Sequence, residues 1–217
     1  WRGAPHAIRV DNGPEYISQI MQDWAALGVE SFFHGKEPWM NYHDQLIHPL
    51  SKIVGALPHE LVVMNQLTVN LHLMLVSFYR PTANRYKIIC EAKAFPSDQY
   101  TFETHVKHHG FDPNDAIVEA TPREGEHCIR NEDILNAIQE NSDSTALVLF
   151  SGINYYTGQL FDMASITKAA QSAGANVGFD LAHAAGNVEL QLHDWGADFA
   201  CCCTYKYMNS GPGAIGG

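Results

Sequence analysis

Short runs of apolar and β-branched residues alternate with amphipathic stretches over most of the chain. The short runs are typical of buried strands, whereas the stretches between them repeat their apolar residues at helical spacing. Strands are expected at 86–91, 116–119, 145–150, 176–180 and 198–203, and helices at 98–108, 132–140 and 163–173. We expect Asn131 to be the N-cap of the second of these helices. The alternation predicts an α/β fold with a mainly parallel sheet flanked by helices on both faces.

The first part of the chain carries helical patterns only. Amphipathic helices are expected at 16–27 and 46–54, where apolar residues recur at helical spacing. The stretch 67–79 is apolar almost all round, which predicts a buried helix. We therefore expect an N-terminal helical arm over residues 1–60 and one large domain over residues 61–217.

Charge and composition narrow the classes of function. The chain has 13 Lys and Arg against 24 Asp and Glu, a formal net charge of −11, so nucleic acid and anionic membranes are poor partners. No apolar run reaches the roughly 18 residues that a membrane-spanning helix needs. The five cysteines include the run Cys201–Cys203, which is a poor disulfide framework and favours the cytoplasm. Adjacent cysteines on a strand point to opposite faces, so we expect no metal site there. His105, His108 and His109 are expected to face solvent.

Two residues near the C-terminus suggest a cofactor. Asp180 ends one expected strand and Lys206 follows the next. An enzyme that uses pyridoxal 5′-phosphate (PLP) needs a lysine amine to form the imine with the cofactor and a carboxylate to pair with the protonated pyridine nitrogen. Each residue alone has a simpler explanation, since such an acid is often a helix cap and such a lysine is often solvated. Together, with Lys206 between Tyr205 and Tyr207, they favour PLP.

Other polar and aromatic side chains follow the expected strands at the same end of the sheet. Phe95 and Asp98 come after the first strand, Ser151 after the third and His183 after the fourth. Ligands of parallel sheets bind at this carboxyl end. Phe95 has the alternative of a core residue and His183 that of a buried histidine.

A phosphate site is expected where the helix 67–79 begins. Leu67 and Thr68 lie at that end, and free backbone amides at a helix N-terminus bind phosphate well. Ser151 or Tyr205 would help to hold the phosphate. The alternative for Thr68 is an N-cap without a ligand.

Several longer blocks resemble the kynureninase family, a group of fold-type-I PLP enzymes in the aminotransferase superfamily. The blocks are NQLTVNLH at 65–72, AKAFPSD at 92–98, FDLAHAAGNV at 179–188, LHDWG at 192–196 and YKY at 205–207. The resemblance covers nearly the whole chain from about Lys36 onward. It implies catalytic roles for Lys206, Asp180 and Tyr205, and cofactor contacts by Leu67, Thr68, Phe95, Asp98, Ser151, Asp180, His183, Tyr205 and Lys206.

The resemblance also implies a reaction and an assembly. The reaction is hydrolysis of L-kynurenine or 3-hydroxy-L-kynurenine to anthranilate or 3-hydroxyanthranilate plus L-alanine, in tryptophan catabolism and NAD biosynthesis. The assembly is a homodimer. The chain is expected to be a fragment that lacks an N-terminal segment and a C-terminal small domain, and Cys202 stands where the family has a tryptophan. Two alternatives stay open: another fold-type-I PLP enzyme, such as a cysteine desulfurase or class V aminotransferase, or a non-catalytic fragment.

Overall fold

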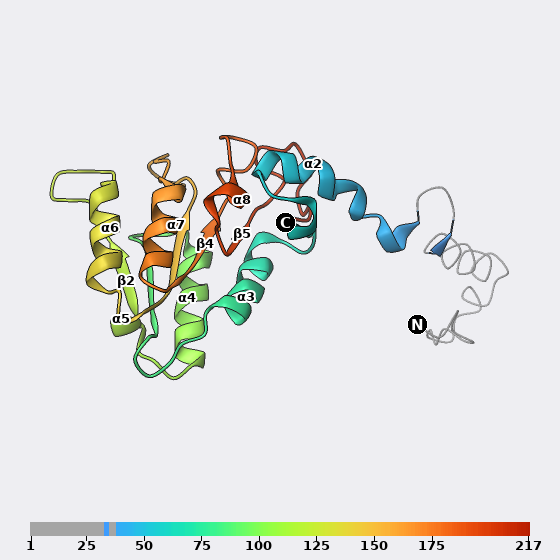
Figure 1. Cartoon of the computed structure of the whole chain (residues 1–217). Coiled ribbons are helices and arrows are strands. Elements are labelled where there is room, and N and C mark those ends of the chain that lie inside the picture. Colours follow the sequence, from blue (N-terminus) through green and yellow to red (C-terminus); the bar gives the residue numbers. More distant parts are fainter. Residues whose placement is uncertain (1–32, 35–37) are drawn as a thin grey trace, which may run out of the picture. The chain divides into compact units, whose positions relative to one another are not determined.

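The computed structural model describes residues 33–34 and 38–217 (Figure 1). The chain divides into two compact units, Trp1–Leu46 and Ile47–Gly217. The helix expected at 16–27 lies outside the described residues. The expected boundary near residue 60 stays a prediction. Before the first strand lie η2 (Trp39–Asn41), α2 (Asp44–Val54) and η3 (Pro58–Glu60).

A five-stranded parallel sheet forms the centre of the second unit. Its strands are β1 (Lys87–Glu91), β2 (Ile117–Ala120), β3 (Thr145–Ser151), β4 (Asn176–Asp180) and β5 (Phe199–Cys201). The strand order is β2-β1-β3-β4-β5, and each neighbouring pair is parallel. The expected α/β fold is confirmed. In this order the strand sequence reverses between β1 and β3, which is where open parallel sheets bind ligands.

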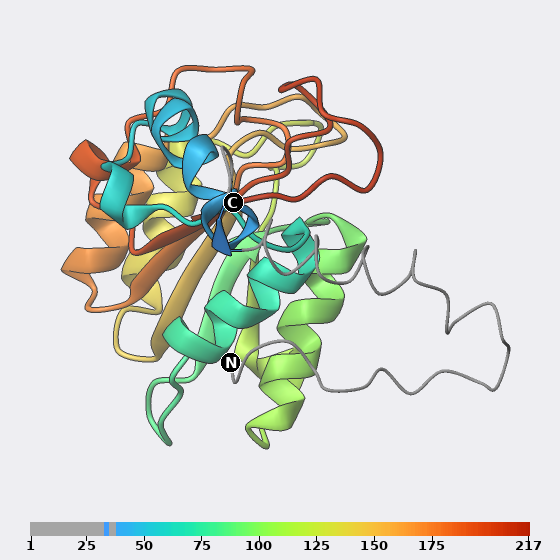
Figure 2. The ribbon, with the colours of Figure 1, turned by 90° about the vertical axis from the view of Figure 1, so that its right-hand side faces the viewer.

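Helices cover both faces of this sheet (Figure 2). On one face lie α3 (Leu67–Phe78) and α4 (Pro96–His108), and on the other lie α6 (Asn131–Glu140) and α7 (Met163–Ser172). The short helices α5 (Pro113–Ala116) and α8 (Leu192–Trp195) precede β2 and β5. Alternate strand residues point to opposite faces, so the sheet contributes to two apolar cores.

The cysteine run shows how the strand pattern separates these cores. Cys201 and Cys203 lie in the core that contains Leu71 and Phe102 of α3 and α4, whereas Cys202 lies in the core on the α6 and α7 side. All three thiols are buried and free. The expectation that they are packing residues is therefore confirmed.

Three local expectations were wrong, each because of tertiary contacts. Asn131 is the first residue of α6 and not its N-cap, because its side-chain amide donates to Ser165 Oγ of α7 at 3.1 Å.

The helix 67–79 is not buried all round, because the sheet covers one side of α3 and leaves Val69, Leu73 and Val76 exposed, Val76 by 67%. His105 is buried, at 8% exposure, because it faces α3; His108 and His109 are exposed as expected.

The last expected strand is also shorter than predicted. The pattern predicted a strand over 198–203, whereas β5 ends at Cys201. Cys202 N–H donates instead to the Gly217 carbonyl at 2.8 Å, and Cys203 forms an isolated bridge with Gly216. The chain therefore leaves the sheet early and begins the loop that carries Lys206.

Candidate cofactor-binding site

A cavity of about 110 Å³ lies at the carboxyl ends of the strands. The strand ends are level there, because Ser151 pairs with Asp180 and Asp180 pairs with Cys201 in the register of the sheet. The cavity is lined by Gln66, Leu67, Thr68, Phe95, Ser97, Ser151, Ile153, Tyr155, Asp180, Ala182, His183, Tyr205 and Lys206. Every site residue expected from the sequence is on this list except Asp98.

A larger cavity of about 620 Å³ lies elsewhere, beside β5 and α3, and most residues around it are apolar. None of the candidate site residues expected from the sequence lines this larger cavity. The candidate binding and catalytic side chains thus lie around the smaller cavity, where a few polar groups converge from several elements.

Three buried acids lie at or beside the site, and of these only Asp180 lines the cavity. Asp180 ends β4 and is 4% exposed, Asp98 lies in the first turn of α4 at 2%, and Glu91 ends β1 at 2%. Asp98 and Asp180 are joined by a hydrogen bond between their carboxyl groups. Burial, followed by the charge of Asp180 and a hydrogen bond to it, raises the pKa of Asp98 to about 9. Asp98 therefore carries the shared proton at neutral pH and donates it to Asp180.

Opposing effects act on the pKa of Asp180. Burial raises its pKa, but the hydrogen bond from Asp98, the Ala182 N–H at 2.7 Å and the positive charge of Lys206 act in the opposite direction. A buried carboxylate with hydrogen-bond donors behind it is suited to hold a cation in front of it. This is the arrangement that a protonated pyridine nitrogen requires.

Glu91 was not among the residues expected from the sequence. Both of its carboxylate oxygens accept the backbone N–H of Ser151 at 3.1 Å, which ties the end of β1 to the end of β3. Burial raises the pKa of Glu91, and the charge of Asp180 adds to that effect. The available signal was an acid that ends an apolar strand, the same signal that identified Asp180.

Lys206 lies half-buried in the loop after β5. Its Nζ donates to Cys203 Sγ at 3.6 Å and lies 5.1 Å from the centre of the Tyr205 ring. The turn around Gly186, which has φ +79°, packs closely against this loop. A Cβ at Gly186 would lie only 2.9 Å from Met208 Cγ. Lys206 is thus placed at the cavity by packing that does not involve its own amine.

The N-terminus of α3 forms another wall. The first backbone amides of a helix have no partner within the helix, and Gln66 at the N-cap does not bind them with its side chain. Leu67 is buried while Thr68 is exposed to the cavity side. Free amides and the positive end of the helix dipole suit a phosphate.

Aromatic residues and a histidine complete the rim. Phe95 is 45% exposed and meets Tyr155 edge to face, with ring centres 5.1 Å apart. The backbone reaches Phe95 through Lys93, which has φ 56°, a left-handed conformation that is uncommon for lysine and marks a constrained loop. His183 Nδ1 lies 3.3 Å from the Tyr207 hydroxyl, and burial together with the charge of Lys206 lowers the His183 pKa.

These residues fit PLP. The hydroxyl of Ser151 is buried and makes no hydrogen bond of good geometry, so it has capacity for a ligand. An amine, a buried carboxylate, an open ring face and a helix N-terminus line one cavity, and PLP has a matching aldehyde, pyridine nitrogen, ring and phosphate. Among the described residues, no group of three or more His, Cys, Asp or Glu could hold a metal ion, and no helix is long and apolar enough to cross a membrane.

The aminotransferase class-V family model matches residues 17–216. The chain belongs to this family. Lys206 and Asp180 therefore lie in a fold of the kind that the residues at the strand ends predicted.

Two relatives in this family have high identity to the chain. Kynureninase of Flavobacterium psychrophilum is 63% identical over 202 residues, and kynureninase of Flavobacterium johnsoniae is 62% identical over 202 residues. Each match covers 93% of this chain and 48% of the relative, so the chain spans about half the length of these proteins.

Solved structures agree on the fold. A cysteine desulfurase from Thermococcus onnurineus, solved without ligand, matches 90% of the chain and 49% of its own length with a TM-score of 0.69 and 18% identity. At that identity the likeness concerns the fold alone. It shows that the sheet and its flanking helices share the fold of that protein, and it does not select a reaction.

Proposed function

We propose that the chain holds PLP in the cavity at the carboxyl end of its sheet. Lys206 attaches the cofactor, Asp180 pairs with its pyridine nitrogen, and Phe95 lies against its ring. The N-terminus of α3, with Leu67 and Thr68, binds the phosphate. The observation that carries the proposal is a half-buried lysine and a buried, hydrogen-bonded carboxylate lining one cavity.

The other cofactor residues support these four contacts. Asp98 keeps its proton and donates it to Asp180, which fixes Asp180 as the anion. Ser151 and Tyr205 offer hydroxyl groups near the phosphate end, and His183 stays neutral beside Tyr207. Each group therefore binds, orients or holds a proton at a fixed place.

The proposed reaction is hydrolysis of L-kynurenine or 3-hydroxy-L-kynurenine to anthranilate or 3-hydroxyanthranilate plus L-alanine. When bound, PLP supplies an electron sink for bond cleavage next to the substrate amine. Lys206 moves the proton at the substrate α-carbon, and Tyr205 lies beside it. Kynureninase relatives with 63% and 62% identity over 93% of the chain support this reaction above a desulfurase or aminotransferase reaction.

The wider setting follows from the same proposal. The reaction belongs to tryptophan catabolism and NAD biosynthesis, and the five free cysteines suit a cytoplasmic enzyme. A homodimer is proposed, supported by the exposed apolar side chains of α3, Val69, Leu73 and Val76. Light scattering would test it, and a stable, fully active monomer would contradict it.

Lys206 provides the decisive test. Borohydride reduction of the chain with PLP, followed by peptide mapping, is expected to place the label on Lys206. Lys206→Ala is expected to lose the label and all measurable release of anthranilate from kynurenine while keeping its circular dichroism spectrum. Lys168→Ala, a lysine on α7 away from the cavity, is the matched control and should keep both.

The outcomes separate the alternatives. Label on a residue other than Lys206 would disprove the cofactor site. Label on Lys206 with sulfide release from cysteine and no anthranilate would replace the reaction by that of a desulfurase. Label without any turnover would identify a non-catalytic chain.

A further inference from the structure

A pair of histidines joins the two helices on one face of the sheet. His72 Nδ1 of α3 lies 3.0 Å from His105 Nε2 of α4, and the ring centres are 5.2 Å apart. His72 Nε2 lies 3.2 Å from the hydroxyl of Thr101, which is fully buried on α4. Neither histidine lines the cavity or was given a role by the sequence.

With one proton on each imidazole ring, the hydrogen bonds allow a single arrangement. Thr101 donates its hydroxyl proton to the Ser97 carbonyl at 2.7 Å, so its oxygen can only accept from His72 Nε2–H. With its proton on Nε2, His72 accepts Nε2–H of His105 at Nδ1. Burial, followed by the charges of His72, His109 and His108, lowers the pKa of His105 to about 4, which agrees with a neutral His105.

Both helices begin at the cofactor cavity. Leu67 and Thr68 at the start of α3 form the proposed phosphate site, while Phe95 and Ser97 at the start of α4 line the ring side. Ser97 is also the acceptor at the end of the histidine chain, and its hydroxyl donates to Asp98 at 3.2 Å. The hydrogen-bond chain therefore connects α3 to the first turn of α4, which carries Asp98.

Apolar packing alone does not fix the position of α3 along α4. Leu71 and Leu75 of α3 belong to the same core as Phe102 and Val106 of α4, and such contacts are not directional. Close packing opposes large shifts of one helix along the other, but it does not set the relative position of two polar groups as sharply as a hydrogen bond does. Hydrogen bonds weaken steeply with distance and angle, so the histidine chain resists sliding.

We propose that His72 and His105 are positioning residues that keep the phosphate-binding end of α3 in register with the ring-binding end of α4. This inference rests on the proposed function, because it concerns the two ends of one bound PLP. A slide of either helix would change the distance between the two subsites without disrupting either of them.

Comparison of PLP with pyridoxal, which lacks the phosphate, tests the inference. PLP must satisfy both subsites, whereas pyridoxal uses the ring side only. In His105→Leu we expect PLP affinity to fall about fivefold, the order of one lost hydrogen bond, and pyridoxal affinity to change by less than about twofold. His105→Gln places an amide N–H near the position of Nε2–H and should restore PLP affinity to within about twofold of the original.

Two matched controls separate positioning from packing. His108→Leu removes an exposed histidine of the same helix and should change neither affinity. Phe102→Leu loosens the apolar contact and should lower the melting temperature without changing the ratio of the two affinities. Equal losses for PLP and pyridoxal in His105→Leu, or no loss for either, would overturn the inference.

A measurement on the unchanged chain guards against a variant that fails to fold. Nitrogen chemical shifts of the imidazoles should show each ring protonated at Nε2. A His105 ring protonated at Nδ1 alone would contradict the proposed chain. If the unchanged chain itself fails to attach PLP at Lys206, the proposed function fails and this inference fails with it; normal attachment with unaffected variants removes the inference alone.

Discussion

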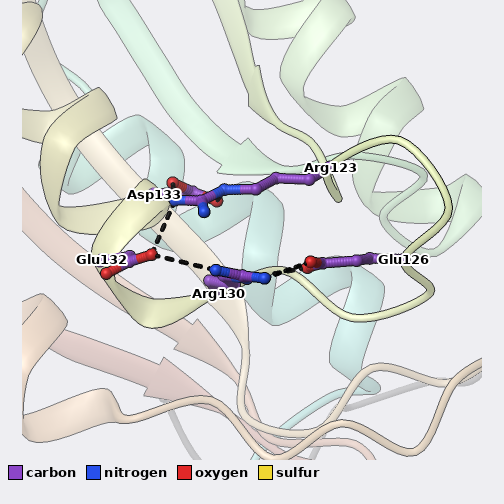
Figure 3. A network of polar contacts seen from close by, with 5 residues as sticks. All are labelled: Arg123, Glu126, Arg130, Glu132 and Asp133. Carbon is purple, nitrogen blue, oxygen red and sulfur yellow. Dashed lines mark hydrogen bonds and ion pairs between the residues drawn. The ribbon is translucent and has the colours of Figure 1, made fainter.

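Acidic residues occur in two contrasting settings in this protein. Near the start of α6, Arg123 donates from Nε and a terminal nitrogen to both carboxylate oxygens of Asp133, at 2.9 and 2.7 Å, and reaches Glu132 at 2.7 Å (Figure 3). Arg130 bridges Glu132 and Glu126 in the same network. Under the cofactor cavity, by contrast, Glu91, Asp98 and Asp180 are all buried.

The pKa of Asp133 at the surface and the pKa values of the buried acids shift in opposite directions. The hydrogen bond from Arg123 lowers the pKa of Asp133, whereas burial raises the pKa values of Asp98 and Asp180. The surface group has its positive partners within the chain and lies mostly in water, so its gain in stability is small. The buried group has more acid than base around it, and Asp98 reduces the excess of negative charge by keeping its proton. The contrast supports the proposal that a bound ligand brings positive charge to Asp180.

Among these acidic residues, the largest effect is expected from removing the buried charge at Asp180. Asp180→Asn keeps the shape but leaves the pyridinium without its partner, and loss of one member of a buried pair costs about 3 kcal/mol or more. Kynurenine hydrolysis should fall by a factor on the order of 100 or more. Steady-state assays of anthranilate release would measure it. Asp194→Asn, an exposed acid on α8, is the control, and an Asp180→Asn variant with activity equal to this control would refute the contrast.

A smaller effect is expected on the pH dependence of stability without cofactor. The folded-state pKa of Asp98 is about 9, above its ordinary value of 3.8, so the folded chain holds this proton more tightly than the unfolded chain. The stability that this proton contributes is complete below the ordinary value and is lost as the pH rises through about 9. Between pH 7 and 9 the unfolding free energy should fall by up to about 1.4 kcal/mol per pH unit.

Asp98→Asn sharpens this test because the amide cannot titrate. Denaturant unfolding at several values of pH should give a flatter profile for the variant between pH 7 and 9. His105 does not affect stability in this pH window. Its pKa is lowered from 6.5 to about 4, so the stability that its neutral form contributes is complete above pH 6.5 and is lost as the pH falls toward 4. Equal slopes for both proteins would show that Asp98 does not hold the proton.

The smallest effect is expected at the surface. Arg123→Ala removes the central partner of Asp133 and Glu132, yet both acids can return to water. The melting temperature should change by no more than about 2 °C, and PLP binding should not change. The difference should vanish near 1 M salt, where charges are screened over about 3 Å. A large loss that persists in high salt would place this network among the structural requirements of the fold.

The sequence by itself determined the class of fold and the chemistry at the strand ends. Periodicity located the strand Asn176–Asp180, because a buried parallel strand needs a continuous apolar run and Asp180 interrupts it. The same logic placed Lys206 after β5. The carboxyl ends of parallel strands lie at one edge of the sheet, so the edge that carries the cavity followed from the parallel arrangement.

Only the tertiary structure decided which polar groups have partners across elements. Glu91 binds Ser151 of a different strand, and the hydrogen bond between Asp98 and Asp180 joins a helix to a strand. Asn131 turned to Ser165, and His105 turned to His72, although local pattern suggested a cap and a solvent-exposed ring. Such contacts depend on which helix lies opposite, and periodicity along one segment carries no information about its neighbour in space.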